Sequence, residues 1–472
     1  MKIATPLLLL PIVMVLTGCV VGPDYHPTSV PAPAAWTDRP VSTTTPSDLA
    51  SWWRQFHDPI LDRLIGQAAS ANTDVAQNIA KLRQARASLV QEKAGLYPTL
   101  DSSASGTRAR QSLADIGGAG TITSNTYKAS FDTSFELDIF GGQRRSIESA
   151  DASREAAAED LNDTVRTVLG DVARYYVEAR GYQARIAVAK DTLALRTDTL
   201  HLTRAKAQGG TGTGLDAVQA QAEMESAAAT IPPLEYSFRE SVNRLAVLTG
   251  MPPQVMLDLL RAPKPIPRLA GTIEPDPPVA ALARRPDIRA AERRVASATA
   301  DIGVAQADRF PAISLAGSLG LNSSRIRSFA NASSNVWSLG PTVNLPIFDA
   351  GKRAAKVDEK IADRDEKIAV WQAAVRNALE ETENALIALD REQAHNIALR
   401  RTVDAYAEAL KVSEVQYQAG LDTFLNVLDA GRSLANQRDD LAASDVQLAV
   451  DAIALYKALG GGWQDAGRLV EP

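Results

Sequence analysis

The stretch Phe131-Asp-Thr-Ser-Phe-Glu-Leu-Asp-Ile-Phe140 decides how the rest of the chain can fold. Its apolar side chains occupy the odd positions and its polar side chains the even ones, and the same alternation runs back to Tyr127. A period of two predicts a β-strand with one apolar and one polar face, over 126–140. At roughly thirteen residues the strand is long for a globular protein, and its length suits a tilted strand that crosses a bilayer.

The chain is also internally duplicated. Asn72-Thr-Asp74 and Arg285-Pro-Asp287 each open a helical segment, and their aspartates are 213 residues apart (287 − 74 = 213). A period this long indicates two copies of one large unit rather than a solenoid. We predict a first repeat over 59–250 and a second over 279–463, joined by a proline-rich segment, 251–278.

Each repeat is expected to contribute two strands. They are predicted at 98–110 and 126–140 in the first repeat and at 311–323 and 335–348 in the second. The odd positions of the two later strands are mostly apolar, and the positions between them are mostly small or polar. The strand 98–110 has the weakest pattern, because its apolar face consists mostly of Ser, Ala and Gly.

A long helical hairpin follows each strand pair, over 142–249 and 352–459. The first helix of each hairpin contains no proline and repeats its apolar residues every seven positions, which predicts supercoiled packing. Helices of about 67 residues would be roughly 100 Å long. Because their exposed faces carry charged residues throughout, we expect the hairpins to project into an aqueous compartment.

Four amphipathic strands cannot close a membrane barrel by themselves, since such a barrel needs about eight strands or more and tolerates no open edge in lipid. Strands from two, three or four chains would therefore have to be pooled. We favour three chains, because six helical repeats around an axis would also form a tube. The predicted fold class is mainly α-helical with a β-barrel part.

Composition and the N-terminal segment narrow the function. Of the 472 residues, 22% are charged, and the net charge of −6 argues against a nucleic-acid partner. Residues 1–18 have the basic start and short apolar core of an export signal. Cys19, the sole cysteine, follows Leu16-Thr-Gly in a pattern that resembles the lipoprotein cleavage box, so we expect it to be acylated. Residues 19–58 are expected to form an extended tether and 464–472 a tail.

Several motifs, in order along 17–463, resemble the outer membrane factor family (TolC-like), and most closely its OprM/NodT-type lipoprotein branch. They are the Cys19 box, Gly22-Pro-Asp-Tyr25, Trp52-Trp53 with Phe56-His-Asp58-Pro59, Phe135-Glu-Leu-Asp-Ile-Phe140-Gly, Arg285-Pro-Asp287 with Ala291-Glu292, Tyr417-Gln-Ala-Gly420, and Leu455-Tyr-Lys-Ala-Leu-Gly-Gly-Gly-Trp463. The resemblance implies a homotrimer with a 12-stranded transmembrane β-barrel continued by a periplasmic α-helical barrel.

The same resemblance implies a function and a location. The chain would be the outer-membrane exit duct of a tripartite efflux system, passively conducting small molecules such as drugs. Its partners would be a periplasmic membrane-fusion adaptor, an inner-membrane transporter of the RND type and outer-membrane lipid. A duct for type I protein secretion is the alternative within transport, and a structural coiled-coil envelope protein is the alternative outside it. The strand pairs argue against the coiled-coil alternative, because a coiled-coil rod has no use for strands of bilayer length.

Enzymatic chemistry finds no support in the sequence. The four histidines are scattered, and no Cys/His spacing suits a metal. We therefore expect no catalytic residues, no metal and no cofactor apart from the lipid on Cys19. The glycine-rich stretch 209–214 follows a helix and lacks the Lys-Ser/Thr of a phosphate loop, so we interpret it as a hairpin tip.

The polar face of the strand over 126–140 is one candidate site. Asp132, Glu136 and Asp138 would line a water-filled lumen. The simpler interpretation is that these three carboxylates only keep a water-facing surface hydrated. The alternative is that their negative charges make the lumen favour cations.

The other candidate site is the tip of the second hairpin. On the family motif, Leu425 would form a hydrophobic ring at the periplasmic mouth, and Asp429 and Arg432, with Tyr417, would hold that mouth shut. Asp429 and Arg432 are three residues apart and share a helix face, so an ordinary surface ion pair is the alternative. The first repeat has Gln219 and Ala222 at these positions, 210 residues earlier (429 − 219 = 210), so the gate charges would come from the second repeat.

Overall fold

The computed structural model describes most of the chain after the predicted signal segment. The described residues are 20–27, 29–37, 49–112, 120–269, 271 and 273–464. The signal segment 1–18 and Cys19 lie outside them, as does nearly all of the predicted tail. The chain divides into two compact units, and each is described by itself. Unit 1 comprises residues up to Thr28, Lys81–Ala157 and Ala290–Trp371, and unit 2 comprises Ser29–Ala80, Ala158–Arg289 and the chain from Gln372 onward.

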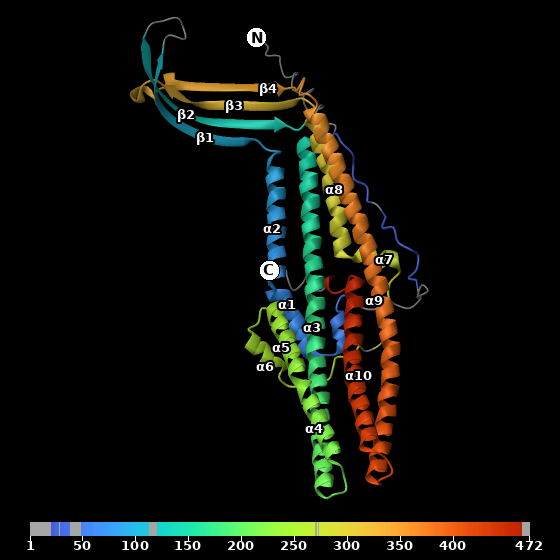
Figure 1. Ribbon diagram of the computed structural model, residues 1–472. Coiled ribbons are helices and arrows are strands. Elements are labelled where there is room, and N and C mark those ends of the chain that lie inside the picture. The colour runs from blue at the N-terminus through green and yellow to red at the C-terminus, as the bar shows by residue number, and fades with distance from the viewer. Residues whose placement is uncertain are drawn as a thin grey trace. The chain divides into compact units, whose positions relative to one another are not determined.

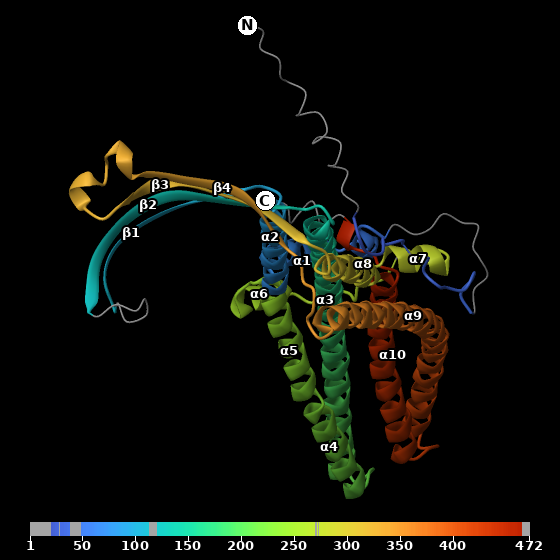
Figure 2. The ribbon, with the colours of Figure 1, turned by 90° about the horizontal axis from the view of Figure 1, so that it is seen from above.

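Unit 1 contains one four-stranded antiparallel sheet in the order β1-β2-β3-β4 (Figure 1). Its strands are β1 (Thr99–Ser112), β2 (Thr121–Leu137), β3 (Ala312–Ser323) and β4 (Asn335–Asn344). The two strands of the first repeat pair with the two of the second through β2 and β3. Seen from above, the long strands curve together (Figure 2). Two short 3-10 turns, Ile326–Ser328 and Ala332–Ser334, lie in the β3–β4 connection.

The register gives this sheet two chemically distinct faces. Phe131 pairs with Leu319, which pairs with Trp337, and these three apolar side chains are 60%, 62% and 77% exposed. On the other face, Asp132 pairs with Ser318. Because side chains alternate across a strand, the predicted apolar and polar faces each continue across neighbouring strands.

Both edges of the sheet are open within the part of the chain that the structure describes. β1 pairs on one side with β2, and β4 pairs on one side with β3. The outer edges of β1 and β4 therefore present unpaired backbone groups, which can form hydrogen bonds with strands from another chain.

Four helices contribute their strand-proximal parts to unit 1. They are α2 (Thr73–Ala94), α3 (Gly142–Gln208), α8 (Pro286–Ala307) and α9 (Lys352–Gln418). A small core of Ile302, Ala305 and Val357 joins α8 to α9. At the junction between strands and helices the rings of Phe140 and Phe310 stack, with centroids 4.6 Å apart. This stacking packs the segment that follows β2 against the segment that follows α8.

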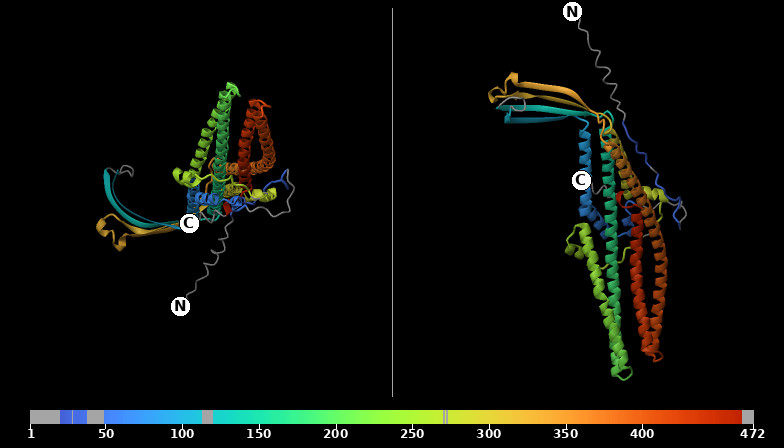
Figure 3. Two further views of the ribbon diagram at one scale, coloured as in Figure 1. Left: turned by 90° about the horizontal axis from the view of Figure 1, so that it is seen from below. Right: turned by 45° about the horizontal axis from the view of Figure 1, so that its top comes forward.

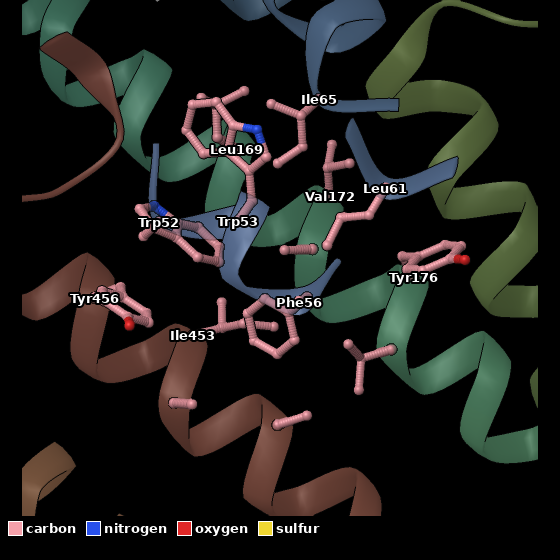
Figure 4. Packing of buried hydrophobic residues seen from close by; sticks show 14 of the residues in the cluster. Trp52, Trp53, Phe56, Leu61, Ile65, Leu169, Val172, Tyr176, Ile453 and Tyr456 are labelled. Atoms are coloured by element: carbon pink, nitrogen blue, oxygen red, sulfur yellow. The ribbon is translucent and has the colours of Figure 1, made fainter. Parts of the chain in front are cut away.

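Unit 2 holds the main hydrophobic core and the distal parts of the hairpins. Its further elements are η2 (Trp52–Phe56), α1 (Pro59–Ala71), α4 (Gly214–Ala229), α5 (Ile231–Thr249), α6 (Pro253–Leu260), α7 (Pro278–Arg284) and α10 (Phe424–Ala458). The short η2 segment inserts Trp52 and Phe56 among α3 and α10 (Figure 4). The ring of Trp52 stacks on that of Tyr456 at 5.3 Å. The aromatic motif near the N-terminus is thus a core element of this unit.

In unit 2, α4 returns along α3 and α10 returns along α9 (Figures 1 and 3). The two return segments differ: α10 is unbroken, whereas the return segment of the predicted hairpin 142–249 is split into α4 and α5 at Thr230. The cause is Pro232-Pro233 in the first turn of α5, because proline lacks the N–H that a continuous helix needs there.

The strand limits also differ from prediction. β2 begins at Thr121 and ends at Leu137, and β4 ends at Asn344, before Pro346. Proline cannot donate to the ladder, yet Pro341 stands within β4 opposite Leu315, where it is tolerated because β4 is an edge strand. Within the described residues, no helix combines the length and the apolar character needed to cross a membrane.

Candidate functional site

The tip of the second hairpin is built by a tight glycine turn. Gly420 has φ +72°, a left-handed conformation that only glycine adopts readily, and Leu421 N–H donates to the Gln416 carbonyl at 2.8 Å. Thr423 is extended and immediately precedes α10. This turn places the first residues of α10 beside the last residues of α9.

One side of the tip is packed. Phe424 is buried together with Val427, Leu428 and other apolar residues of both hairpins. The ring of Tyr417 lies 5.4 Å from that of Phe424, and the Lys206 ammonium lies 4.0 Å from the centre of the Tyr417 ring. Tyr417 therefore links the tips of the two hairpins through apolar and cation–π contacts.

The opposite side of the tip is exposed. The Leu425 side chain is 62% exposed, and Arg432 Nη2 donates to Asp429 Oδ1 at 2.9 Å with both side chains more than half exposed. The structure thus brings Asp429 and Arg432 together and places Leu425 near them along the helix. Tyr417 contacts Phe424 and Lys206 instead. The gate assignment of these four residues stays a prediction.

Arg196 is a residue of this region that the sequence analysis missed. It is 6% exposed, on α3, and its guanidinium faces Gly431 on α10. Burial lowers the pKa of Arg196; the carboxylate of Glu223, 4.0 Å away, counteracts this, and the positive charge of Arg432 adds to it. Arg196 stands three residues after Leu193 in the apolar heptad, so a cation at a core-facing position was the signal that could have identified it.

Two of the three predicted lumen carboxylates lie on the polar face of β2. Asp132 Oδ2 accepts a hydrogen bond from Ser130 at 2.8 Å, and Asp132 stands opposite Asp101 of β1. Glu136 pairs with Ser314 of β3. Their role as a lumen lining remains a prediction.

The third predicted lumen carboxylate, Asp138, has its hydrogen-bond partners in α3. It lies one residue beyond the end of β2, and its carboxylate accepts hydrogen bonds from the backbone N–H groups of Gln143 and Arg144 at 3.0 and 3.1 Å. The Arg144 side chain also pairs with it at 3.0 Å. Asp138 therefore satisfies free N–H groups in the first turn of α3. The repeating pattern did not show that the strand ends before Asp138, and the role of Asp138 in a lumen lining stays a prediction.

The segment that follows Cys19 is fixed to unit 1 by Arg145. The Val21 N–H donates to the Phe140 carbonyl at 3.1 Å, and the buried guanidinium of Arg145 donates to the Val21 and Gly22 carbonyls and to the Asp24 carboxylate. Cys19 itself lies outside the described residues, so its predicted lipidation is untested.

No group of three or more His, Cys, Asp or Glu side chains in the described part of the chain is arranged to hold a metal ion. The candidate site is thus a set of polar, apolar and charged surfaces at the strand face and the hairpin tip.

Comparison with known proteins decides what kind of molecule carries these surfaces. The sequence matches the family described as "Outer membrane efflux protein" over residues 64–251 and 278–461. The chain belongs to the outer membrane efflux protein family. Its members are outer-membrane channels, and this family member is an efflux channel located in the outer membrane and extending into the periplasm. A passive channel requires no catalytic constellation.

Individual relatives of this efflux protein agree over nearly the whole chain. Nodulation protein T of Rhizobium leguminosarum bv. trifolii is 34% identical, covering 96% of this chain and 97% of that protein. Outer membrane protein OprJ of Pseudomonas aeruginosa is 30% identical, with 97% and 96% covered. Toluene efflux pump outer membrane protein TtgI of Pseudomonas putida is 31% identical, with 95% and 97% covered.

Solved structures support the same fold. The outer-membrane channel OprN superposes with a TM-score of 0.88 at 34% identity, covering 94% of this chain and all of that one. The open-state outer membrane channel MtrE of Neisseria gonorrhoeae gives 0.81 at 29% identity, with 94% and 99% covered.

Proposed function

We propose that this efflux protein is a homotrimeric exit duct that passively conducts small toxic molecules out of the cell. In this proposal three four-stranded sheets pool into a 12-stranded transmembrane barrel, and the hairpins form a periplasmic α-helical tube. A periplasmic adaptor and an inner-membrane transporter of the RND type deliver the cargo. A lipid on Cys19 adds a membrane anchor.

The observation that carries the proposal is the sheet with two faces and two open edges. Its apolar side chains are exposed in the single chain, and Trp337 alone is 77% exposed. In a bilayer, open edges at β1 and β4 would leave backbone groups unpaired at a cost of several kcal/mol each. Joining the β4 edge of one chain to the β1 edge of the next removes both problems at once.

Disulfide trapping tests the assembly. Ser103 of β1 and Ser338 or Thr342 of β4 lie on the same polar face by register, so Ser103→Cys combined with Ser338→Cys or Thr342→Cys should give intermolecular cross-links under oxidation. We expect a ladder on denaturing gels that ends at three chains. A ladder ending at two or four chains would change the stoichiometry, and cross-linking no greater than in Ser103→Cys alone would overturn the barrel.

The relative TtgI is a toluene efflux pump outer membrane protein, which favours small-molecule cargo over the alternative of type I protein secretion. Expressed in cells that lack their own efflux duct, the chain with its cognate adaptor and transporter should lower intracellular accumulation of a fluorescent efflux substrate. Restored export of a secreted protein without any change in dye accumulation would favour the secretion alternative.

A further inference from the structure

The end of the sheet farthest from the helices carries an excess of cations. Four exposed arginines, here called the outer arginines, lie at the end of β1 and in the β3–β4 connection: Arg108, Arg110, Arg325 and Arg327. The described residues of this end, 102–112, 120–131 and 319–337, contain no Asp or Glu. The described part of this end is therefore basic in a protein whose net charge is −6, while Asp115, in the β1–β2 connection, lies outside the described residues.

The register places two of the outer arginines on the apolar face. In β1 the residue that pairs with Tyr127 is Gly106, and the next residues on that face are Arg108, opposite Asn125, and Arg110, opposite Thr123. Arg110 Nε donates to the Thr121 hydroxyl at 3.0 Å, which fixes its side chain on this face. The arginines thus begin where the apolar band of Phe131 and its neighbours ends.

These cations have no acidic partner in the described part of the molecule. The ion pairs of the described residues do not include any of the outer arginines, and the Thr121 hydroxyl that Arg110 contacts is uncharged. Four like charges at one rim repel one another, and an anion would relieve that repulsion. The rim has the charge and the donors to hold an anionic partner.

We propose that the outer arginines bind the phosphate groups of the phosphorylated glycolipid that forms the outer leaflet of the outer membrane. The proposal rests on the barrel orientation proposed above, in which the apolar face of the sheet contacts lipid. A lipid whose acyl chains pack on Phe131 and Leu319 then has its headgroup at the level of Arg108 and Arg110. The planar guanidinium matches phosphate with two parallel hydrogen bonds, which makes arginine better suited to this position than lysine.

The position favours a lipid over free phosphate as the source of the anion. A site for a dissolved anion would not need to lie on the membrane side of a strand, directly beyond its apolar band. The opposite face offers a matched comparison: Lys128 pairs with Ser105 and Asn322 on the polar face and is also exposed. It is a cation near the same end of β2 that lipid would not reach.

The test compares Arg108→Gln/Arg110→Gln with Lys128→Gln in the purified full-length channel. Binding of bisphosphorylated lipid A and of dephosphorylated lipid A is measured by native mass spectrometry, with inorganic phosphate as competitor. We expect the wild type and Lys128→Gln to prefer the phosphorylated lipid, and the double variant to bind it at least about tenfold more weakly, as loss of charge-assisted hydrogen bonds predicts. Arg325→Gln/Arg327→Gln should weaken binding in the same direction.

Three outcomes would overturn the proposal: equal affinity of the wild type for both lipids, unchanged affinity in the double variant, or equal loss in Lys128→Gln. Complete displacement by millimolar inorganic phosphate would assign the rim to a dissolved anion and also count against it. Failure of the barrel itself would look different, because the wild type would then form no heat-resistant oligomer on gels. Gel mobility of each variant serves as the folding control.

Discussion

The tips of the two hairpins share a backbone and differ in the side chains that the backbone presents. Gly210 and Gly420 have φ of +71° and +72°. The residues that precede the return helices also agree, with φ and ψ of −96° and 149° at Thr213 and −88° and 151° at Thr423. Reversing a long helix within a few residues thus imposes the same conformations in both repeats.

The exposed side chains were free to diverge. The second tip has Asp429 and Arg432 in a hydrogen-bonded pair, whereas the first has Gln219 and Ala222 at the equivalent positions. The comparison teaches that the duplication preserves what the backbone needs and varies the surface chemistry. Residues that differ between the repeats are therefore the better candidates for function.

The other ends of the return helices follow the same rule. Asn72 Nδ2 donates to the Leu248 carbonyl at 2.9 Å, and Arg285 Nη1 donates to the Ala458 carbonyl, also at 2.9 Å. Each contact caps the C-terminal end of a return helix, and the donors are 213 residues apart (285 − 72 = 213). The second repeat has replaced a neutral donor by a buried cation, with Asp287 and Glu381 as its partners at 2.7 Å each.

The largest effect should come from that cation. Arg285→Ala removes a buried guanidinium whose partners are the partly buried Asp287 and the exposed Glu381, and we expect it to lower the free energy of unfolding by about 3 kcal/mol, the lower end of the range for breaking a buried ion pair. Asn72→Ala removes one hydrogen bond and should cost about 1–3 kcal/mol. Thermal unfolding of the purified channel, followed by circular dichroism, measures the loss of stability in both variants.

Arg391→Ala, with a side chain that is 75% exposed, is the control for loss of an arginine. Equal losses for Arg285→Ala and Asn72→Ala would mean that the charge adds nothing to the cap.

Burial alone would raise the pKa of Asp287, but its hydrogen bond and ion pair with Arg285 outweigh this and hold that pKa below its usual value. The stabilisation from this pair is thus present above the ordinary aspartate pKa, and it is lost as the pH falls through the lowered one.

A glycine lets a helix of the first repeat approach a helix of the second closely. Gly181 of α3 faces Val446 of α10 so closely that a Cβ would overlap the valine side chain. Gly181→Ala should therefore destabilise by about 1–2 kcal/mol net, overpacking being partly offset by better helix propensity. The same substitution at Gly170, where a Cβ meets the flexible side chain of Lys457 at 3.3 Å, is the control and should be close to neutral in the same measurement.

Position 391 of the second repeat is the counterpart of Gly181 (391 − 181 = 210), and it carries an exposed arginine. The second repeat thus has no glycine on α9 where Gly181 lets α3 approach α10. A stable Gly181→Ala variant would show that α3 and α10 can separate at little cost.

Patterns that repeat along the chain were readable from the sequence. Side-chain direction alone predicts the alternating faces of β2, β3 and β4. It also predicts a group of four strands too few to close a barrel within one chain. Features set by contacts between distant segments were not readable. Arg145 on the Val21 carbonyl and Arg196 against Gly431 depend on which helices meet, and the position of Asp138 depends on where the strand stops.

A third prediction separates the two tips by their helix caps. The Thr213 hydroxyl accepts from the Asp216 N–H at 3.2 Å, and the Asp216 carboxylate accepts from the Thr213 N–H at 3.3 Å. Thr213→Ala should lose about 1 kcal/mol locally. Thr423 makes no such side-chain cap, so Thr423→Ala should be close to neutral. Hydrogen exchange of the first-turn amides of α4 and α10 measures the difference, and equal acceleration at both tips would contradict it.

The smallest change in stability, and the most informative change in function, should come from the pair at the second tip. Asp429 and Arg432 are exposed, so removing both should alter the free energy of unfolding by only a few tenths of a kcal/mol. If the pair helps to close the periplasmic mouth, a ring of such contacts repeated by symmetry is broken in every subunit at once. Asp429→Ala/Arg432→Ala should then give larger or more frequent openings in planar-bilayer recordings and more antibiotic leak in cells. Gln219→Ala, at the equivalent position of the first repeat, should leave both unchanged. Unaltered conductance and leak in the double variant would remove the gate assignment and leave an ordinary surface ion pair.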